Sequence, residues 1–146
     1  MVPLHNDPRP PDFLVQLRRT QHAVRSRLNE ELAPTGLTTP QYAVLAELES
    51  RGGSSASELG RAIGVTAQTM NVLVGGLESG GLVARTDHPA HGRILVVKLT
   101  RHGRAALKRG RALARAVEDQ LLAGVAPAER DRLLETLKGI EARSQP

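Results

Sequence analysis

The sequence predicts an all-α fold of six helices with one small β-hairpin. In several segments apolar residues recur at alternating three- and four-residue steps, which is the spacing of an amphipathic helix. Residues 82–99 depart from that pattern, with two short strand-like runs on either side of a stretch of loop composition. The core must be mainly aliphatic, since the 146 residues are 40% hydrophobic but include one Phe, one Tyr and no Trp. That length suits one domain.

The first helix is expected to follow a flexible arm. Residues 1–11 hold four of the nine prolines, a composition that disfavours regular structure. Asp12 is a suitable N-cap, because a short carboxylate accepts hydrogen bonds from first-turn amides. An apolar stripe continues to about Leu32, and the sequence Ala-Pro-Thr-Gly at 33–36 ends the helix.

The second and third helices both begin with the pattern of a capping box. Thr38 and Gln41 have the three-residue spacing at which each side chain bonds the other's backbone amide. Residues 51–54, Arg-Gly-Gly-Ser, end that helix. Ser55 and Glu58 repeat the pattern at the start of a shorter helix.

The fourth helix is expected from Thr66 to about Ser79, and the hairpin follows it. Residues 82–85 and 94–99 are the two predicted strands, and the second is rich in β-branched side chains. Thr100 is the expected cap of a fifth helix. The apolar stripe of that helix contains small residues, which predicts close contact with a partner helix: Leu107, Gly110, Ala114, Val117 and Leu121. A sixth amphipathic helix is expected at 127–143.

The third and fourth helices together have helix-turn-helix spacing. Leu59 and Ile63 would face inward from the first of them, and Met70 and Leu73 from the second. Gly64 supplies the residue that can adopt the left-handed conformation needed between them. This geometry exposes the N-terminal residues of the second helix, which in DNA-binding proteins enter the major groove.

The candidate base-reading side chains are those at the exposed start of that helix: Thr66, Gln68, Thr69 and Asn71. Gln and Asn can pair bidentately with adenine, and Thr can contact a phosphate or a thymine methyl group. Ser55 and Ser57 are the candidate phosphate contacts. An ordinary helical hairpin with solvated polar residues remains the alternative at this point.

The positive charge is segregated along the chain. The formal net charge is only +5. Residues 79–116, however, contain nine basic residues and one acidic residue, a local charge of +8. Segregated positive charge is expected of a nucleic-acid binder, although a basic solvated helix face has the same composition.

From about Phe13 to Arg143 the sequence resembles the MarR family of winged helix-turn-helix regulators. The resemblance rests on residues 36–48, 55–83 and 96–107, with Leu-Thr-x-x-Gly at 99–103. It implies a homodimeric transcription regulator, commonly a repressor, that binds double-stranded DNA at a palindromic operator and in some members responds to a small-molecule effector. The implied organisation is a domain at 12–146, with dimerisation helices at about 12–33, 100–124 and 127–143 and a DNA-binding lobe at about 38–99.

The resemblance also implies that the hairpin is a wing reaching the minor groove. The expected contacts there are Arg93, with Arg85 and His91. The family commonly has Asp-Arg-Arg at the wing tip, whereas this chain has His-Gly-Arg at 91–93. The arginine is kept but its carboxylate support is not, and whether Asp87 replaces that support is left open. From residue 62 to 84 the only charge is Glu78, so the fourth helix contributes almost no phosphate neutralisation.

Several other functions are not expected. The absence of cysteine excludes disulfides, thiol nucleophiles and thiol redox sensing. No nucleotide-binding or hydrolase motif occurs, so neither an enzyme nor a cofactor is predicted. No apolar run approaches the roughly 20 residues that span a bilayer, which indicates no membrane partner and a cytoplasmic location.

Two further sites were weighed and not assigned. Asp87, His88 and His91 have ligand types that suit zinc, but no fourth ligand is evident and no metal is predicted. The family's usual effector pocket lies between the dimer helices and the DNA-binding lobe, and His22 and Tyr42 are candidates to line it, although packing and surface roles explain them more simply. The scarcity of aromatic residues leaves the ligand unnamed. The alternative function is a nonspecific architectural DNA-binding or protein-interaction module.

Overall fold

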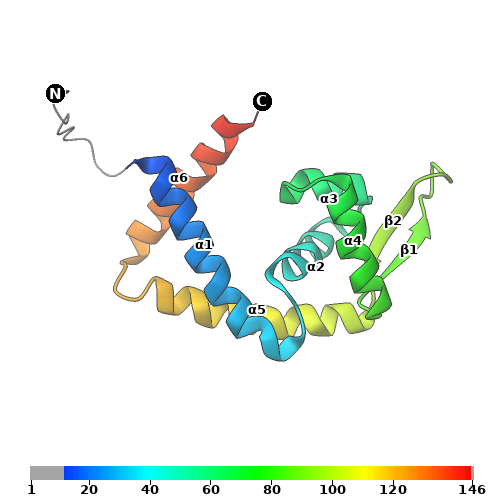
Figure 1. The fold of residues 1–146 in the computed structure, drawn as a ribbon, viewed down its shortest axis with the longest axis horizontal. Coiled ribbons are helices and arrows are strands. Elements are labelled where there is room, and N and C mark those ends of the chain that lie inside the picture. The colour runs from blue at the N-terminus through cyan, green and yellow to red at the C-terminus, as the bar shows by residue number, and fades with distance from the viewer. Residues whose placement is uncertain (1–11, 146) are drawn as a thin grey trace, which may run out of the picture. The chain divides into compact units, whose positions relative to one another are not determined.

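The computed structural model describes residues 12–145 and contains six α-helices and one antiparallel hairpin (Figure 1). This confirms the predicted fold class. The described residues form two compact units, which meet in sequence between Ala114 and Arg115, and the arm expected at 1–11 lies outside the described residues. The elements are α1 (Phe13–Leu32), a 3-10 turn η1 (Ala33–Thr35), α2 (Thr39–Arg51), α3 (Ala56–Ile63), α4 (Ala67–Ser79), β1 (Val83–Asp87), β2 (Leu95–Leu99), α5 (Arg101–Leu121) and α6 (Pro127–Ser144).

The predicted helix starts are confirmed by their hydrogen bonds. The Asp12 side chain accepts from the amide of Leu14 at 3.1 Å at the start of α1. The capping box of α2 is complete, because Gln41 also accepts from the amide of Thr38 at 3.0 Å. These bonds satisfy first-turn amides that have no partner inside the helix.

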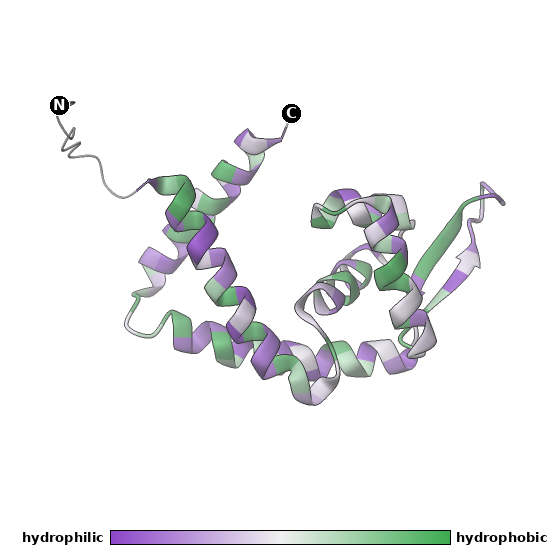
Figure 2. Cartoon of the chain, in the orientation of Figure 1, coloured by the Kyte–Doolittle hydropathy of each residue, from purple (hydrophilic) through white to green (hydrophobic). Residues whose placement is uncertain are grey.

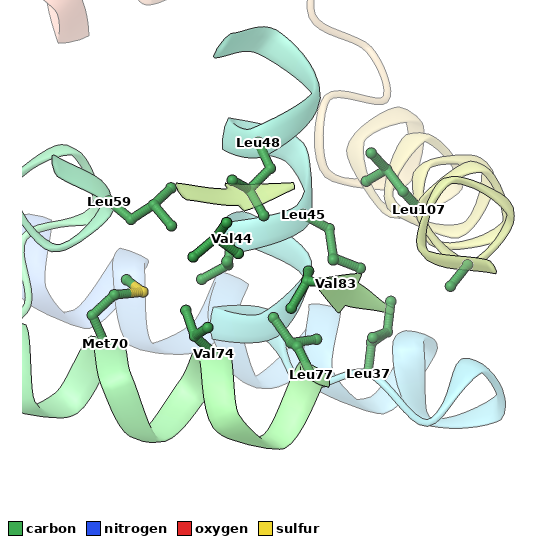
Figure 3. Close-up of a cluster of buried hydrophobic side chains, with 12 residues drawn as sticks. Leu37, Val44, Leu45, Leu48, Leu59, Met70, Val74, Leu77, Val83 and Leu107 are labelled. Atoms are coloured by element: carbon green, nitrogen blue, oxygen red, sulfur yellow. The ribbon is translucent and has the colours of Figure 1, made fainter. Parts of the chain in front are cut away.

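The core of the first unit is aliphatic, as the composition predicts. Its side chains come from Leu37 before α2 and from α2, α3, α4, the hairpin and the first turns of α5 (Figure 3). Tyr42 is only partly buried at the margin of this cluster. The fully or nearly fully buried members are Leu37, Val44, Leu45, Leu48, Leu59, Met70, Val74, Leu77, Val83, Val97, Ala106 and Leu107.

β2 packs the hairpin against the core of the first unit. Val96 and Val97 are buried, and Figure 2 shows hydrophobic residues along this strand. Its partner β1 is antiparallel, with Arg85 opposite Val97. Ser54, in the loop after α2, adds a short bridge on the other edge of β2, with backbone bonds to Val97 of 3.1 and 2.8 Å. β2 is therefore held on one edge by β1 and on the other edge by the α2–α3 loop.

The small residues of the α5 stripe have a partly different role from the one expected. A Cβ atom on Gly110 would lie 3.0 Å from Cδ2 of Tyr42, so this glycine makes room for a ring of the same chain. Leu107 and Val117 are buried as well, whereas Leu121 is 49% exposed. The absence of a side chain at Gly110 therefore allows the Tyr42 ring to pack closely against α5 within the first unit.

The second unit contains the end of α5 and all of α6. Arg130 of α6 forms an ion pair with Glu118 of α5. Three leucines of α6, Leu133, Leu134 and Leu137, are 42–46% exposed. No helix in the described part of the chain is both long and apolar enough to cross a membrane.

Candidate nucleic-acid interface

The helix-turn-helix is built around Gly60 and Gly64. Gly64 has φ +80°, a conformation that side chains disfavour, and its amide donates to the Gly60 carbonyl at 2.9 Å. A Cβ atom on Gly60 would lie 3.0 Å from the carbonyl oxygen of Val65, so the turn packs directly onto α3. Leu59 and Met70 are fully buried between the two helices. The start of α4 is consequently exposed.

Two of the four candidate base readers, Thr66 and Thr69, are hydrogen bonded to each other. The Thr66 hydroxyl accepts from the Thr69 amide at 3.1 Å and donates to the Thr69 hydroxyl at 2.9 Å. Both residues are exposed. The structure therefore gives Thr66 a helix-capping role, and its hydroxyl would have to serve that role and any DNA contact together.

The other two candidate base readers on α4 make no such contacts. Gln68 and Asn71 are exposed, and within residues 12–145 neither side chain takes part in a hydrogen bond. Their amides are available to an external partner. Val72 follows them and is 72% exposed. We assigned it no role from the sequence, although its spacing of four residues from Gln68 places both on one helix face.

The tip of the hairpin is organised by His88. Its Nδ1 accepts from the amides of Ala90 at 3.0 Å and His91 at 3.2 Å. The two imidazole rings lie 5.2 Å apart, centre to centre. His91 and Arg93 are exposed at the tip. No metal-binding group of three or more side chains occurs in the described residues. Nδ1 of His88 already accepts hydrogen bonds from two backbone amides.

The two arginines of the wing lie in different surroundings. Nε of Arg85 is 3.1 Å from a carboxylate oxygen of Glu78, which connects β1 to the end of α4. The Arg85 side chain is 26% exposed, whereas Arg93 is at the open tip. Within residues 12–145 no ion pair joins Asp87 to Arg93, so in this structure Asp87 does not replace the missing carboxylate support.

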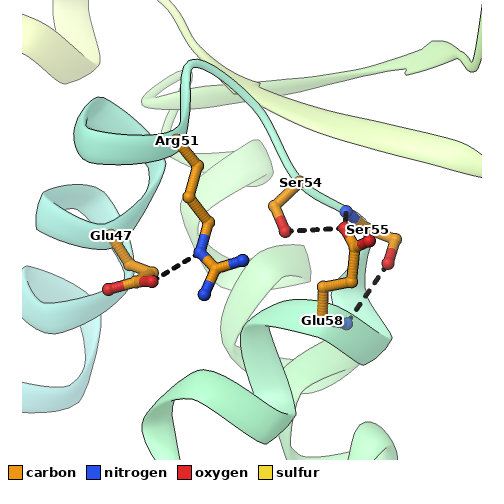
Figure 4. A network of polar contacts seen from close by, with 5 residues as sticks. All are labelled: Glu47, Arg51, Ser54, Ser55 and Glu58. Atoms are coloured by element: carbon orange, nitrogen blue, oxygen red, sulfur yellow. Dashed lines mark hydrogen bonds and ion pairs between the residues drawn. The ribbon is translucent and has the colours of Figure 1, made fainter.

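The loop before α3 contains a second polar network (Figure 4). Glu58 accepts from the Ser55 amide and from the Ser54 hydroxyl, both at 3.0 Å, while Ser55 Oγ accepts from the Glu58 amide at 3.2 Å. The backbone hydrogen bond from Ser55, followed by that from Ser54, lowers the pKa of Glu58. Of the two candidate phosphate contacts, Ser55 is thus a helix cap and Ser57 is exposed.

Much of the predicted positive charge is exposed, but part is neutralised within the chain. Arg111 is 2.6 Å from a carboxylate oxygen of Glu49. This hydrogen bond raises the pKa of Arg111 and keeps it charged. The remaining basic residues of segment 79–116 are exposed apart from Arg85: Arg93, Lys98, Arg101, Arg104, Lys108, Arg109 and Arg115.

A helix-turn-helix followed by an exposed two-stranded hairpin defines a winged helix-turn-helix protein. A model of the MarR family matches residues 35–94. Over 124 residues the chain is 40% identical to the HTH-type transcriptional repressor Rv2887 of Mycobacterium tuberculosis, covering 83% of this chain and 89% of that protein. The chain belongs to the MarR family, which confirms the resemblance found in its motifs.

Solved structures of family members have the same fold. The repressor CouR bound to a 23-mer DNA duplex has a TM-score of 0.83 and 30% identity, covering 89% of this chain and 92% of that one. CouR from Rhodococcus jostii RHA1 bound to p-coumaroyl-CoA has a TM-score of 0.81 and 27% identity, covering 88% of this chain and 91% of that one. Rv2887 in complex with salicylic acid has a TM-score of 0.73 and 33% identity, covering 90% of this chain and 97% of that one.

Proposed function

We propose that this chain is a sequence-specific DNA-binding transcriptional repressor that acts as a homodimer on a palindromic operator. The observation that carries the proposal is the exposed N-terminal half of α4 beside the turn at Gly64, because such a helix can enter the major groove. The repressor relatives, one of them solved on DNA, support this function. The regulatory role implies a protein without catalytic activity or cofactor that works in the cytoplasm.

Gln68 and Asn71 are the proposed base readers. Their amides can each donate to and accept from the major-groove edge of adenine. Thr66 and Thr69 lie at the same helix start, where the Thr66 hydroxyl caps the helix and donates to the Thr69 hydroxyl. Gln68 and Asn71 therefore carry base discrimination in this proposal, and the two threonines shape the helix start.

The wing and the α2–α3 loop supply the proposed contacts outside the major groove. Arg93 is suited to the minor groove, since its cation is exposed at the tip and a narrow minor groove has a strongly negative potential. His91 is exposed beside it, and Arg85 supports the wing through Glu78. Ser57 and the capping residue Ser55 are proposed to face phosphate oxygens. With α4 nearly uncharged, the wing and other basic residues contribute most of the electrostatic affinity.

The homodimer is proposed from apolar side chains that the single chain leaves exposed. On α1, Phe13 and Leu14 are 54% and 69% exposed, and on α6 Leu133, Leu134 and Leu137 remain exposed. Burying such residues against a second copy is favourable. In this arrangement the helices at about 12–33, 100–124 and 127–143 dimerise, and residues 38–99 form the DNA-binding lobe.

A small-molecule effector is the proposed signal that releases DNA. The support comes from relatives solved with salicylic acid and with p-coumaroyl-CoA, which are both aromatic and acidic. Tyr42 packs on Gly110 and lies in the same cluster as Arg111 and Glu49, so we assign it to packing rather than to effector recognition.

The experiment that tests this function is selection of a random-sequence duplex library by the full-length protein, followed by competition with bulk DNA. We expect one enriched palindromic sequence and a preference of about 10³-fold or more over bulk DNA. The alternative, a nonspecific architectural or protein-interaction module, predicts no enriched sequence and a ratio near one. That result would overturn the proposal.

A further inference from the structure

The middle of α4 has an apolar side chain that the fold does not use. Val72 is 72% exposed, whereas Met70, Val74 and Leu77 of the same helix are at most 1% exposed. Those three residues define the buried face, and a step of 100° per residue places Val72 on nearly the opposite side. Removing its methyl groups would therefore cost the core nothing.

Val72 lies in the line of residues that points most directly away from the core. Gln68 precedes it by four residues and Gly75 follows it by three, so the three occupy one outward stripe. No atom lies within 4 Å of the position that a Cβ atom of Gly75 would occupy. The isopropyl group of Val72 consequently stands clear on its C-terminal side, beside a residue that has no side chain.

This stripe carries no charge, and Val72 is its apolar side chain. Between residues 62 and 84 the only charge is Glu78, and its carboxylate is paired with Arg85. In the major groove the one prominent apolar group that distinguishes the base pairs is the 5-methyl group of thymine. A branched aliphatic side chain at the outermost point of the helix matches that group, and it gains nothing from facing a phosphate.

We propose that Val72 is a specificity-determining residue that recognises the 5-methyl group of a thymine in each operator half-site. The proposal rests on the proposed function and adds a particular base to it. Four residues of α-helix rise about 6 Å, which is close to two base-pair steps of about 3.4 Å. The thymine contacted by Val72 therefore lies about two base pairs from the base contacted by Gln68.

The test replaces single thymines with uracil, which removes only the methyl group. Each thymine of the operator selected by the full-length protein is replaced in both half-sites, and binding is measured for the wild type and for Val72→Ala. At one position we expect uracil to weaken wild-type binding about fourfold per half-site, from the transfer free energy of one buried carbon. Val72→Ala should bind the thymine and uracil duplexes equally there.

Two control variants make the result specific. Asn71→Ala changes the neighbouring side chain and should keep the full uracil effect at that position. Val72→Ile retains the aliphatic contact and should also keep it. Thermal unfolding of Val72→Ala should occur at or slightly above the wild-type temperature, because the side chain is exposed and alanine has the higher helix propensity.

Each outcome decides a separate point. If an operator is selected but uracil weakens Val72→Ala as much as the wild type at every position, the inference about Val72 is wrong and the repressor function stands. The same conclusion follows if no thymine is sensitive to uracil. If no sequence is enriched at all, the proposed function fails and this inference fails with it.

Discussion

Gly103 in the first turn of α5 lies directly against the carbonyl group of Leu82, at the start of the wing. A Cβ atom on Gly103 would be 1.9 Å from that oxygen. The contact belongs to a larger junction, since the Leu82 oxygen accepts from the Thr100 amide at 3.1 Å, and the Thr100 hydroxyl donates to the Gly81 carbonyl at 2.6 Å. The Thr100 hydroxyl also accepts from the Gly103 amide at 3.0 Å. The Leu-Thr-x-x-Gly motif is thus the joint between wing and helix.

Gly103→Ala should destabilise the protein strongly. The added methyl group cannot fit unless α5 moves from Leu82, so we expect a loss of at least about 2 kcal/mol in the free energy of unfolding, typical of severe overpacking. Urea unfolding measures this loss. Gly75→Ala is the matched control, because its position is open and helical; it should stabilise by about 0.5–1 kcal/mol through helix propensity. Equal effects of the two substitutions would contradict the steric explanation.

Thr66→Ala should lower stability through the lost helix cap. The hydroxyl accepts from the Thr69 amide, and removal of such a cap costs about 1 kcal/mol. Thr66→Ser keeps the hydroxyl and should unfold within a few tenths of a kcal/mol of the wild type. If Thr66 acts only as a cap, Thr66→Ser will also keep wild-type DNA affinity in a gel shift. A loss of affinity without a loss of stability would instead show that its methyl group contacts DNA.

Stability should fall in acid partly through Glu58. Hydrogen bonds from Ser55 and Ser54 lower its pKa in the folded state below the ordinary value of 4.5. A lowered folded-state pKa means that the carboxylate stabilises the fold above the unfolded-state value, and that this contribution is lost as the pH falls through the folded-state value. Glu58→Gln should therefore be less stable than the wild type at pH 7. The difference should shrink below about pH 4.5 in paired urea titrations; a difference independent of pH would count against this assignment.

Arg93→Ala should weaken operator binding about tenfold, within the range of about 1–3 kcal/mol for a good groove contact. The exposed guanidinium lies at the wing tip, so its removal leaves the core untouched. Arg132→Ala removes the same charge from an exposed position on α6 and should have a much smaller effect. Operator-binding assays at the same salt concentration compare the two variants. Equal losses in both variants would indicate a general effect of charge.

Gln68→Ala should change the base preference more than the nonspecific affinity. The exposed amide is suited to adenine and carries no charge, so phosphate attraction is unaffected by its removal. Library selection with this variant should show relaxed preference at one position of each half-site. A uniform drop in affinity for all sequences would contradict base reading by Gln68.

Much of the architecture could be predicted because its determinants are local. The N-cap at Asp12, the capping boxes beginning at Thr38 and Ser55 and the left-handed Gly64 each involve residues within about four positions of one another. Such interactions are visible as short spacings in the chain. Element ends were less accurate, since β1 runs to Asp87 and α5 ends at Leu121.

The candidate site was only partly predictable, because some of its determinants are contacts between segments that are distant in the chain. Its location at the start of α4 follows from the turn, but the sequence predicted that Arg85 contacts the minor groove together with Arg93. The structure separates them, because Glu78 lies beside Arg85 and not beside the hairpin tip. The sequence assigned no contact to Val72, because an apolar residue in a helix is usually part of the core.

The order of elements, their caps and the exposed start of α4 were therefore determined by residues close together in the chain. Packing between distant segments decided the rest: Gly103 against Leu82, Gly110 against Tyr42, and the outward position of Val72. Spacing reveals which side chains share a helix face. Which face is buried, and what it meets, depends on how the segments fold against one another.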